Sequence, residues 1–278
     1  MTYREFIDTI EKKIQERVGE EEVIQQYETM KNNGVNRIGL VHRKPQVNMS
    51  PTIYMEEFYE QYQDGASIAE LVETICNIYQ QVSEKPPVQV EDALDYHKIK
   101  HKIAYKLIHL EKNCELLKEV PHDIFENLAV VPYVIFENSD LGIATLQIRN
   151  EHLKSWGIDR ETVLTQAVRN SFKILPAKVE QLTDYLYVIT NSKGHFGAAA
   201  LLYPWVLQSL YEKLEENYYI LPSSVHELIA IPESFGLHPD KMRDIVREIN
   251  EEEVLEEEVL SNSVYYYIGE EHRIVTYN

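Results

Sequence analysis

The amino-acid sequence predicts an α+β protein, in which helices pack on a mainly antiparallel sheet. Stretches with apolar residues at every third or fourth position alternate with short apolar runs, which indicates interspersed helices and strands. Several of the short runs are joined by tight turns, and such connections favour antiparallel pairing over a doubly wound parallel sheet. The hydrophobic fraction of 44% and the charged fraction of 26% are ordinary for globular proteins, so a buried core is expected.

A small N-terminal module of helix, hairpin and helices is expected over residues 1–84. Its first helix is predicted at residues 2–18, with Thr2 as the N-cap and Gly19 as the stop signal. Asn33–Gly34 predicts a hairpin turn, because both residues tolerate a positive φ. Ser67 and Glu70 have capping-box spacing at the start of a helix predicted at residues 67–82. The strands of the module are predicted at residues 23–29, 35–42 and 52–55.

A larger C-terminal α+β domain is expected over residues 92–278, after a proline-containing break at residues 84–87. Residues 92–117 are rich in Lys, His and Ile and fit either a helix or a partly extended segment. Helices are predicted at residues 159–172, 198–214 and 239–250, the second broken by Pro204 so that it begins nearer Tyr203. Strands are predicted at residues 128–136, 142–148, 185–190, 218–221, 225–231, 264–268 and 273–277.

Charge and cysteine content narrow the classes of partner. The formal net charge is −19, and such a field repels nucleic-acid phosphates and anionic lipids, so neither direct nucleic-acid binding nor membrane association is expected. Cys76 and Cys114 show no metal-site or redox-pair spacing, so no metal and no cofactor is expected. No apolar leader and no run of 18 apolar residues occurs, which predicts a cytoplasmic location.

The first catalytic candidate is the string of Ser223, Ser224, His226 and Glu227. It places hydroxyl, imidazole and carboxylate groups within five residues of one another. A nucleophile needs a base and an orienting group within reach. Successive residues of a strand point to opposite faces, so Ser224 and His226 can share a face while Glu227 points away. The alternative is a strand entry whose serines satisfy backbone groups. His226 and Glu227 also begin a stretch like a zinc-protease motif, but Ala230 stands where that motif has its second histidine.

Lys193, Gly194 and Gly197 are candidates for anion binding. They lie in a glycine-bearing loop, residues 191–198, which begins with a predicted turn and leads into a predicted helix, where backbone N–H groups can face an anion. The spacing of a phosphate-binding loop is absent. The alternative is that Gly197 allows the helix to pack closely on the sheet.

Two further groups of polar residues have a functional and a surface interpretation. His97 and His101 would share a helix face at a zinc-binding spacing, although no third ligand lies nearby. Glu56, Glu57, Glu60 and Asp64 offer carboxylates on a predicted helix, where split pKa values permit acid–base chemistry. A solvated surface is the alternative for both groups. The basic strip around the histidines can also pair with the acidic run at residues 251–258, within one molecule or across a homo-oligomer.

The sequence favours a non-catalytic protein that binds or regulates a protein partner. No group of residues joins nucleophile, base and orienter, or three metal ligands. The 19 tyrosines suit a polar, aromatic interface. Two alternatives remain: a hydrolase or ligand-binding enzyme with its site around Ser223, Ser224, His226 and Glu227, and an acidic nucleic-acid mimic that binds a basic protein.

Several segments carry a likeness to known sequences: LIHLEKNCELLKEVPHDIFENLAVVPYV, IRNEHLKSWGIDRETVLTQAVRNS, ITNSKGHFGAAALLYPWVL and YILPSSVHELIAIPE. With NGVNRIGLVHRK and TIYMEEFYEQYQDG they resemble a protein family of unknown function from clostridial genomes. This resemblance covers most of the chain, implies no activity or catalytic residue, and suggests an origin in a mobile element or gut commensal. From Trp156 onward the chain is also similar to a second, bacillary family of unknown function, which implies a shared α+β core. The residues that match this second family are Trp156, Ala167, Asn170, Leu175, Pro176, Asn191 and Gly194.

Overall fold

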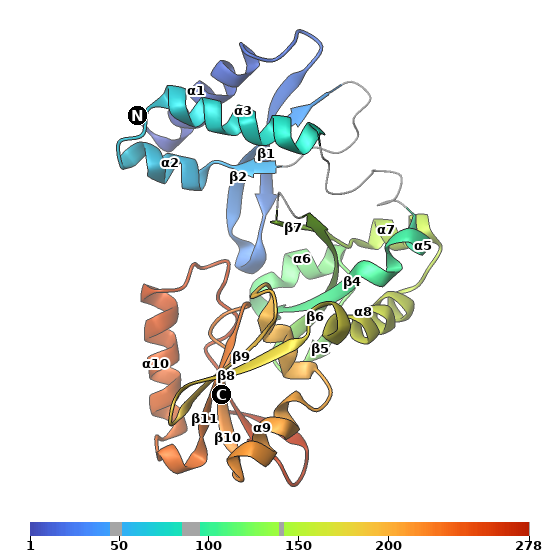
Figure 1. Ribbon diagram of the computed structural model, residues 1–278, viewed down its shortest axis with the longest axis vertical. Helices are drawn as coiled ribbons and strands as arrows, with labels where there is room; N and C mark the ends of the chain where they lie inside the picture. Colours follow the sequence, from blue (N-terminus) through green and yellow to red (C-terminus); the bar gives the residue numbers. More distant parts are fainter. Residues whose placement is uncertain (45–51, 85–94, 139–141, 278) are drawn as a thin grey trace. The chain divides into compact units, whose positions relative to one another are not determined.

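The chain divides into two units in the computed structural model, which describes residues 1–44, 52–84, 95–138 and 142–277 (Figure 1). The first unit contains Met1–Lys31, Val35–Asp95 and Phe136–Ala144. The second contains Asn32–Gly34, Tyr96–Ile135 and Thr145–Asn278. Residues 85–87 of the predicted break lie outside the described residues. Antiparallel sheets pack against helices, so the predicted α+β class is confirmed.

Helix α1 (Tyr3–Gln15) opens the first unit and begins at its predicted cap. The hydroxyl of Thr2 accepts the N–H of Glu5, and the Thr2 N–H donates to the Glu5 carboxylate at 2.8 Å. The helix ends at Gln15, before the predicted end at Val18. It stops there because the N–H of Arg17 turns back to the carbonyl of Ile14 in a tighter turn, so Gly19 lies beyond the helix.

A three-stranded antiparallel sheet and two further helices complete the first unit. Its strands run in the order β1 (Val23–Met30), β2 (Asn36–Arg43), β3 (Thr52–Tyr54). The turn between β1 and β2 holds Asn33 at φ 60° and Gly34 at φ 74°, as their residue types predict. The two helices are α2 (Glu56–Gln63) and α3 (Ile68–Glu84), the latter opened by the predicted Ser67–Glu70 capping box.

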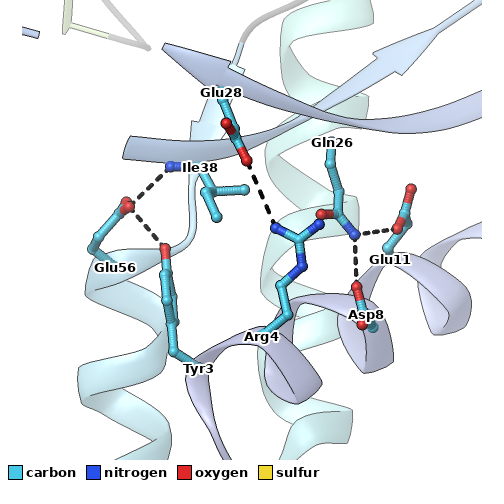
Figure 2. A network of polar contacts seen from close by, with 8 residues as sticks. All are labelled: Tyr3, Arg4, Asp8, Glu11, Gln26, Glu28, Ile38 and Glu56. Carbon is cyan, nitrogen blue, oxygen red and sulfur yellow. Dashed lines mark hydrogen bonds and ion pairs between the residues drawn. The ribbon is translucent and has the colours of Figure 1, made fainter. Parts of the chain in front are cut away.

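One apolar cluster joins these helices to one face of the sheet. Phe6 and Ile10 of α1, Leu40 of β2 and Ile75 of α3 are fully buried in it. Polar contacts also join these elements (Figure 2): one carboxylate oxygen of Glu56 accepts the Tyr3 hydroxyl at 2.7 Å and the Ile38 N–H at 3.0 Å. Burial, followed by the contact with Glu56, raises the pKa of Tyr3. Glu56 therefore ties α1, α2 and β2 together.

The second unit begins with a mixed segment and a four-stranded sheet. Residues 92–117, which fitted either a helix or an extended segment, contain both forms within the described residues. The elements are α5 (Tyr96–Ile99), η2 (Lys100–Lys102), β4 (Ile103–His109), η3 (Glu111–Asn113), α6 (Cys114–Glu119), β5 (Asp123–Phe125), β6 (Leu128–Asn138) and β7 (Gly142–Gln147). The strand order is β4-β6-β5, with β7 paired to β6. Helices α7 (Asn150–Trp156), which was not predicted, and α8 (Arg160–Ile174) follow, and Asp159 caps α8 as predicted.

A six-stranded sheet occupies the rest of the second unit. Its strand order is β13-β12-β10-β11-β9-β8, and every pairing is antiparallel. The strands are β8 (Ala177–Thr183), β9 (Leu186–Asn191), β10 (Tyr218–Leu221), β11 (Leu228–Pro232), β12 (Val264–Ile268) and β13 (Arg273–Tyr277). The connections contain η4 (Gly197–Leu202), α9 (Val206–Leu214), η5 (Glu233–Phe235) and α10 (Pro239–Glu252).

Two predictions for this sheet need correction. The strand predicted at residues 225–231 begins only at Leu228, because the N–H groups of Val225 and His226 bond to the Glu258 carbonyl and the Ser224 hydroxyl instead of a neighbouring strand. The helix predicted at residues 198–214 is two pieces, η4 and α9, divided at Pro204 as the proline suggested. Strand β8 was not predicted.

Both faces of the central strands are covered. On one face Leu221, Ile231 and Val264 pack with Met242 and Val246 of α10. On the other face the hydroxyl of Tyr218 donates to the Leu207 carbonyl of α9 at 2.8 Å. No helix within the described ranges is long and apolar enough to cross a lipid bilayer.

Candidate functional site

The two strings that the sequence analysis treated separately meet in the second unit. The Ser223–Glu227 string joins β10 to β11, and the loop of Lys193, Gly194 and Gly197 follows β9, the neighbour of β11. The N–H of Phe196 donates to Nδ1 of His226 at 3.3 Å, and the Thr190 hydroxyl donates to the His226 carbonyl at 2.8 Å. The sheet order therefore places the imidazole of His226 against the loop after β9.

His226 is held on both sides of its ring. Because Nδ1 accepts a backbone N–H, the neutral ring carries its proton on Nε2. Nε2 lies 3.5 Å from a carboxylate oxygen of Glu258, and both side chains are partly exposed. A carboxylate beside Nε2–H fixes the orientation of an imidazole, although a pair this exposed contributes little to stability.

Ser224 bonds to the backbone of the string. Its hydroxyl oxygen accepts the N–H of His226 at 3.0 Å, a local serine turn. Ser224 also forms an isolated bridge with Val259, and the Ser223 carbonyl accepts the N–H of Leu260 at 2.9 Å. Glu227 is exposed. Within the described residues, the side chain beside Nε2 of His226 is therefore Glu258, whereas the Ser224 hydroxyl bonds to the backbone N–H of His226.

Aromatic and cationic side chains surround the imidazole. The ring of Phe196 stacks on His226 with centroids 5.6 Å apart and planes 7° apart, and Lys106 Nζ lies 4.8 Å from the Phe196 centroid. Tyr133 meets Phe196 edge-on at 5.3 Å. We call Lys106, Tyr133, His195, Phe196, His226 and Glu258 the histidine cluster.

His195 is the most perturbed base of the histidine cluster. Burial, with His226 and Lys106 nearby, lowers the pKa of His195 to about 4, so its imidazole is neutral at physiological pH. Its Nε2 and the Tyr133 hydroxyl are buried, and neither has a hydrogen-bond partner within the described residues. The cluster therefore brings two imidazoles and a carboxylate together, and the backbone N–H of Phe196 orients one of the rings.

The predicted anion-binding loop directs its N–H groups inward. The N–H of Lys193 donates to the Asn191 side-chain oxygen at 3.0 Å, and that of Gly194 to the Asn191 carbonyl at 3.1 Å. Gly197 packs tightly: a Cβ there would lie 2.1 Å from the Thr190 hydroxyl and 2.3 Å from the His226 carbonyl oxygen. Gly197 therefore lies in close contact with β9 and with the string around His226.

The remaining candidates are dispersed. His97 lies in α5 and His101 in η2, so no continuous helix spans both residues. Among Glu56, Glu57, Glu60 and Asp64, Glu56 accepts hydrogen bonds from the Tyr3 hydroxyl and the N–H of Ile38. No group of three or more His, Cys, Asp or Glu side chains within the described ranges could hold a metal ion.

Sequence reasoning missed the partners of His226. Glu258 belongs to the acidic run, and Lys106 and Tyr133 belong to β4 and β6. No local signal links them to His226, because strand pairing and the chain segment beside Val259 bring them together.

Comparison with known proteins gives a family and nothing more specific. No curated protein and no solved structure matched the chain. The model of a family of unknown function (DUF5688) matches residues 3–186 and again residues 183–268. These two matches cover nearly the whole sequence, and no related protein points to a specific function. The chain belongs to this family of unknown function.

Proposed function

We propose that the chain is a non-catalytic protein that binds a protein partner through the edge of its six-stranded sheet. One observation carries the proposal: β8, at the end of the strand order, is exposed along nearly its whole length. An extended segment of a partner can add to such an edge, with backbone hydrogen bonds supplying affinity.

Apolar side chains beside the edge support this proposal. Leu182, at the end of β8, is 61% exposed, and Tyr185 and Phe235 are also exposed, with ring centroids 5.5 Å apart. We call Leu182, Tyr185 and Phe235 the hairpin patch. Large apolar groups gathered next to open backbone groups are typical of protein interfaces.

The charge of the edge favours a protein over a polyanion. The charged side chains of β8 are Lys178 and Glu180, which form an ion pair at 2.6 Å. A neutral edge on a chain of net charge −19 offers no counter-charge to phosphate groups. We therefore propose that the occupant is an extended segment with alternating apolar residues.

The experiment compares two double variants at exposed apolar positions, one at the hairpin of β8 and one outside it. The chain carrying Leu182→Asp and Tyr185→Ser is used as bait in its native host, with wild type and a Leu255→Asp, Tyr277→Ser control alongside. Leu255 and Tyr277 are also exposed, and Tyr277 lies on β13 at the opposite edge. Quantitative mass spectrometry should show a protein recovered with wild type and control but depleted at least about tenfold with the β8 variant.

Equal recovery by all three baits would contradict the proposal. A second copy of the chain is the competing occupant, and light scattering after size-exclusion chromatography distinguishes it. A concentration-dependent dimer that the β8 variant abolishes would assign the edge to self-association instead of a different protein.

The resemblance and the composition support two further proposals. We propose a cytoplasmic location, from the acidic composition, and a clostridial mobile element as the source, from the segments that carry the resemblance. Fractionation of the native host tests the location, and recombinase or mobilisation genes beside the coding sequence test the source.

A further inference from the structure

We propose that the three-stranded sheet of the first unit presents a second binding surface, which accepts an acidic segment of a protein. This surface is separate from the β8 edge, so either proposal can fail alone. Ile24, Leu40 and Ile53 point into the apolar cluster. Successive side chains of a strand alternate in direction, so the residues between them point away from the helices. We call these residues the outer face: Val23, Gln25, Tyr27, Thr29, Arg37, Gly39, Val41, Arg43, Thr52 and Tyr54.

The outer face is open and partly aromatic. Val23 is 51% and Tyr27 50% exposed. Tyr27, Gly39 and Tyr54 stand in register on the three strands. Because Gly39 has no side chain, Thr52 and Tyr54 lean over its backbone, where a Cβ would lie 2.2 Å from the Thr52 methyl carbon. Glycine at this position thus makes room for the Thr52 methyl group.

Positive charge gathers at this face, and negative charge does not. Lys31 Nζ lies 3.9 Å from the centroid of the Tyr54 ring, and the guanidinium carbon of Arg37 lies 5.9 Å from it. Arg43, at the end of β2, is exposed. None of the outer-face residues is Asp or Glu, although the chain has 46 acidic residues against 27 Lys and Arg.

The carboxylates of the same strands and helices lie on the helix side. Figure 2 shows Glu28 directed toward Arg4 of α1, Asp8 and Glu11 bonded to the Gln26 amide, and Glu56 bonded to Tyr3. The first unit therefore separates its charges across the sheet. This separation gives the outer face a local field opposite in sign to that of the whole chain.

An acidic protein segment fits this distribution better than a nucleic acid. A short segment can place carboxylates against Arg43 and against Lys31, which lies over the Tyr54 ring, and apolar groups against Val23 and Tyr27. A polyanion that continues past the face would meet the acidic side of the unit. At physiological salt, charges more than about 8 Å away are largely screened, so the face acts locally in a strongly acidic chain.

Fluorescence anisotropy tests the proposal with a defined probe, a labelled dodecapeptide of four Asp-Glu-Leu repeats. The full chain is compared with a Lys31→Glu, Arg43→Glu variant and with a Lys12→Glu, Lys13→Glu control, which makes the same charge change on exposed positions of α1. Wild type and control should bind with similar affinity, and the outer-face variant about tenfold or more weakly. Rising salt should weaken wild-type binding.

Two measurements keep the test decisive. If reversal of charge perturbs folding, a Lys31→Gln, Arg43→Gln variant replaces the charge-reversal variant. It should keep the urea midpoint of wild type and still bind the peptide more weakly. A labelled dT12 oligonucleotide should bind more weakly than the peptide. Absence of saturable peptide binding, equal weakening by the α1 control, or tighter binding of dT12 would overturn the proposal.

Discussion

The three-stranded sheet and the six-stranded sheet leave different parts of themselves open. The three-stranded sheet packs one face against α1, α2 and α3, and on its outer face Val23 and Tyr27 are about half exposed. The six-stranded sheet has its central strands covered on both faces and exposes the edge strand β8. An open face offers side chains and charge, whereas an open edge offers backbone hydrogen bonds. The comparison teaches that the covering of each sheet decides which chemical groups it exposes. A sheet covered on one face offers side chains, and a sheet covered on both faces offers the backbone of its edge.

The largest effect is expected at Gly197, beneath the covered sheet. Its Cβ would lie against the Thr190 hydroxyl and the backbone carbonyl of His226, and backbone cannot move aside cheaply. Gly197→Ala should therefore lower the free energy of unfolding by about 3 kcal/mol, measured by urea denaturation. Gly19→Ala is the control, because nothing lies within 4 Å of its Cβ. An equal midpoint for both variants would show that β9 and β11 are not held together there.

The same substitution on the open sheet should cost less. In Gly39→Ala the closest atom is the methyl of Thr52, a side chain at the surface, and the Ile53 carbonyl is 3.3 Å away. We expect a loss of roughly 1–2 kcal/mol, partly offset by the smaller entropy of the unfolded alanine chain. The double variant Gly39→Ala, Thr52→Ser removes the clashing methyl and should recover most of the loss. No recovery would mean that Thr52 does not lie over Gly39.

A pH-dependent effect is expected in the second unit, because the pKa of His195 is about 4 in the folded chain. The unfolded histidine has a pKa near 6.5 and takes up a proton more readily, so acid favours unfolding. The stabilisation from the neutral ring is complete above pH 6.5 and is lost as pH falls toward 4. When the pH is lowered from 7 to 5, the urea midpoint of His195→Gln should fall less than that of wild type. Titration of the His195 ring by NMR near its ordinary pKa would contradict this.

The smallest effect is expected at a helix start in the first unit. Ser67→Ala removes the hydroxyl that accepts the N–H of Glu70 and should cost about 1 kcal/mol. Hydrogen exchange of peptides from α3 should quicken, while peptides from β9 to β12 stay unchanged. Ser67→Asp restores an acceptor and should return the exchange to near the wild-type rate.

Local signals predicted those parts of the fold that depend on neighbouring residues. The Thr2 cap, the Asn33–Gly34 turn and the break at Pro204 each follow from the chemistry of one or two residues. Strand β8 escaped prediction because its alternation of apolar and polar residues breaks where Gln181 follows Glu180, which leaves only a short regular run. Helix α7 escaped because it is only 7 residues long and has one buried side chain, Leu153.

The candidate site was predictable in its pieces but not in its assembly. The string around His226 and the loop around Gly197 each contain residue types that stand out in the sequence. Their contact depends on the pairing of β9 with β11, and the approach of Glu258 depends on the bridge between Ser224 and Val259. These are long-range pairings, which periodicity does not encode.

The bulge at Leu182 limits what can dock on the edge of the six-stranded sheet. The register of β8 with β9 shifts between Gln181 and Thr183, so an incoming strand loses its alignment at that point. Only Ala177 to Gln181 then remain in step, a length of roughly 17 Å at about 3.4 Å per residue. A visiting segment is therefore short, and a long β-rich chain or a growing fibril finds no continuous template there.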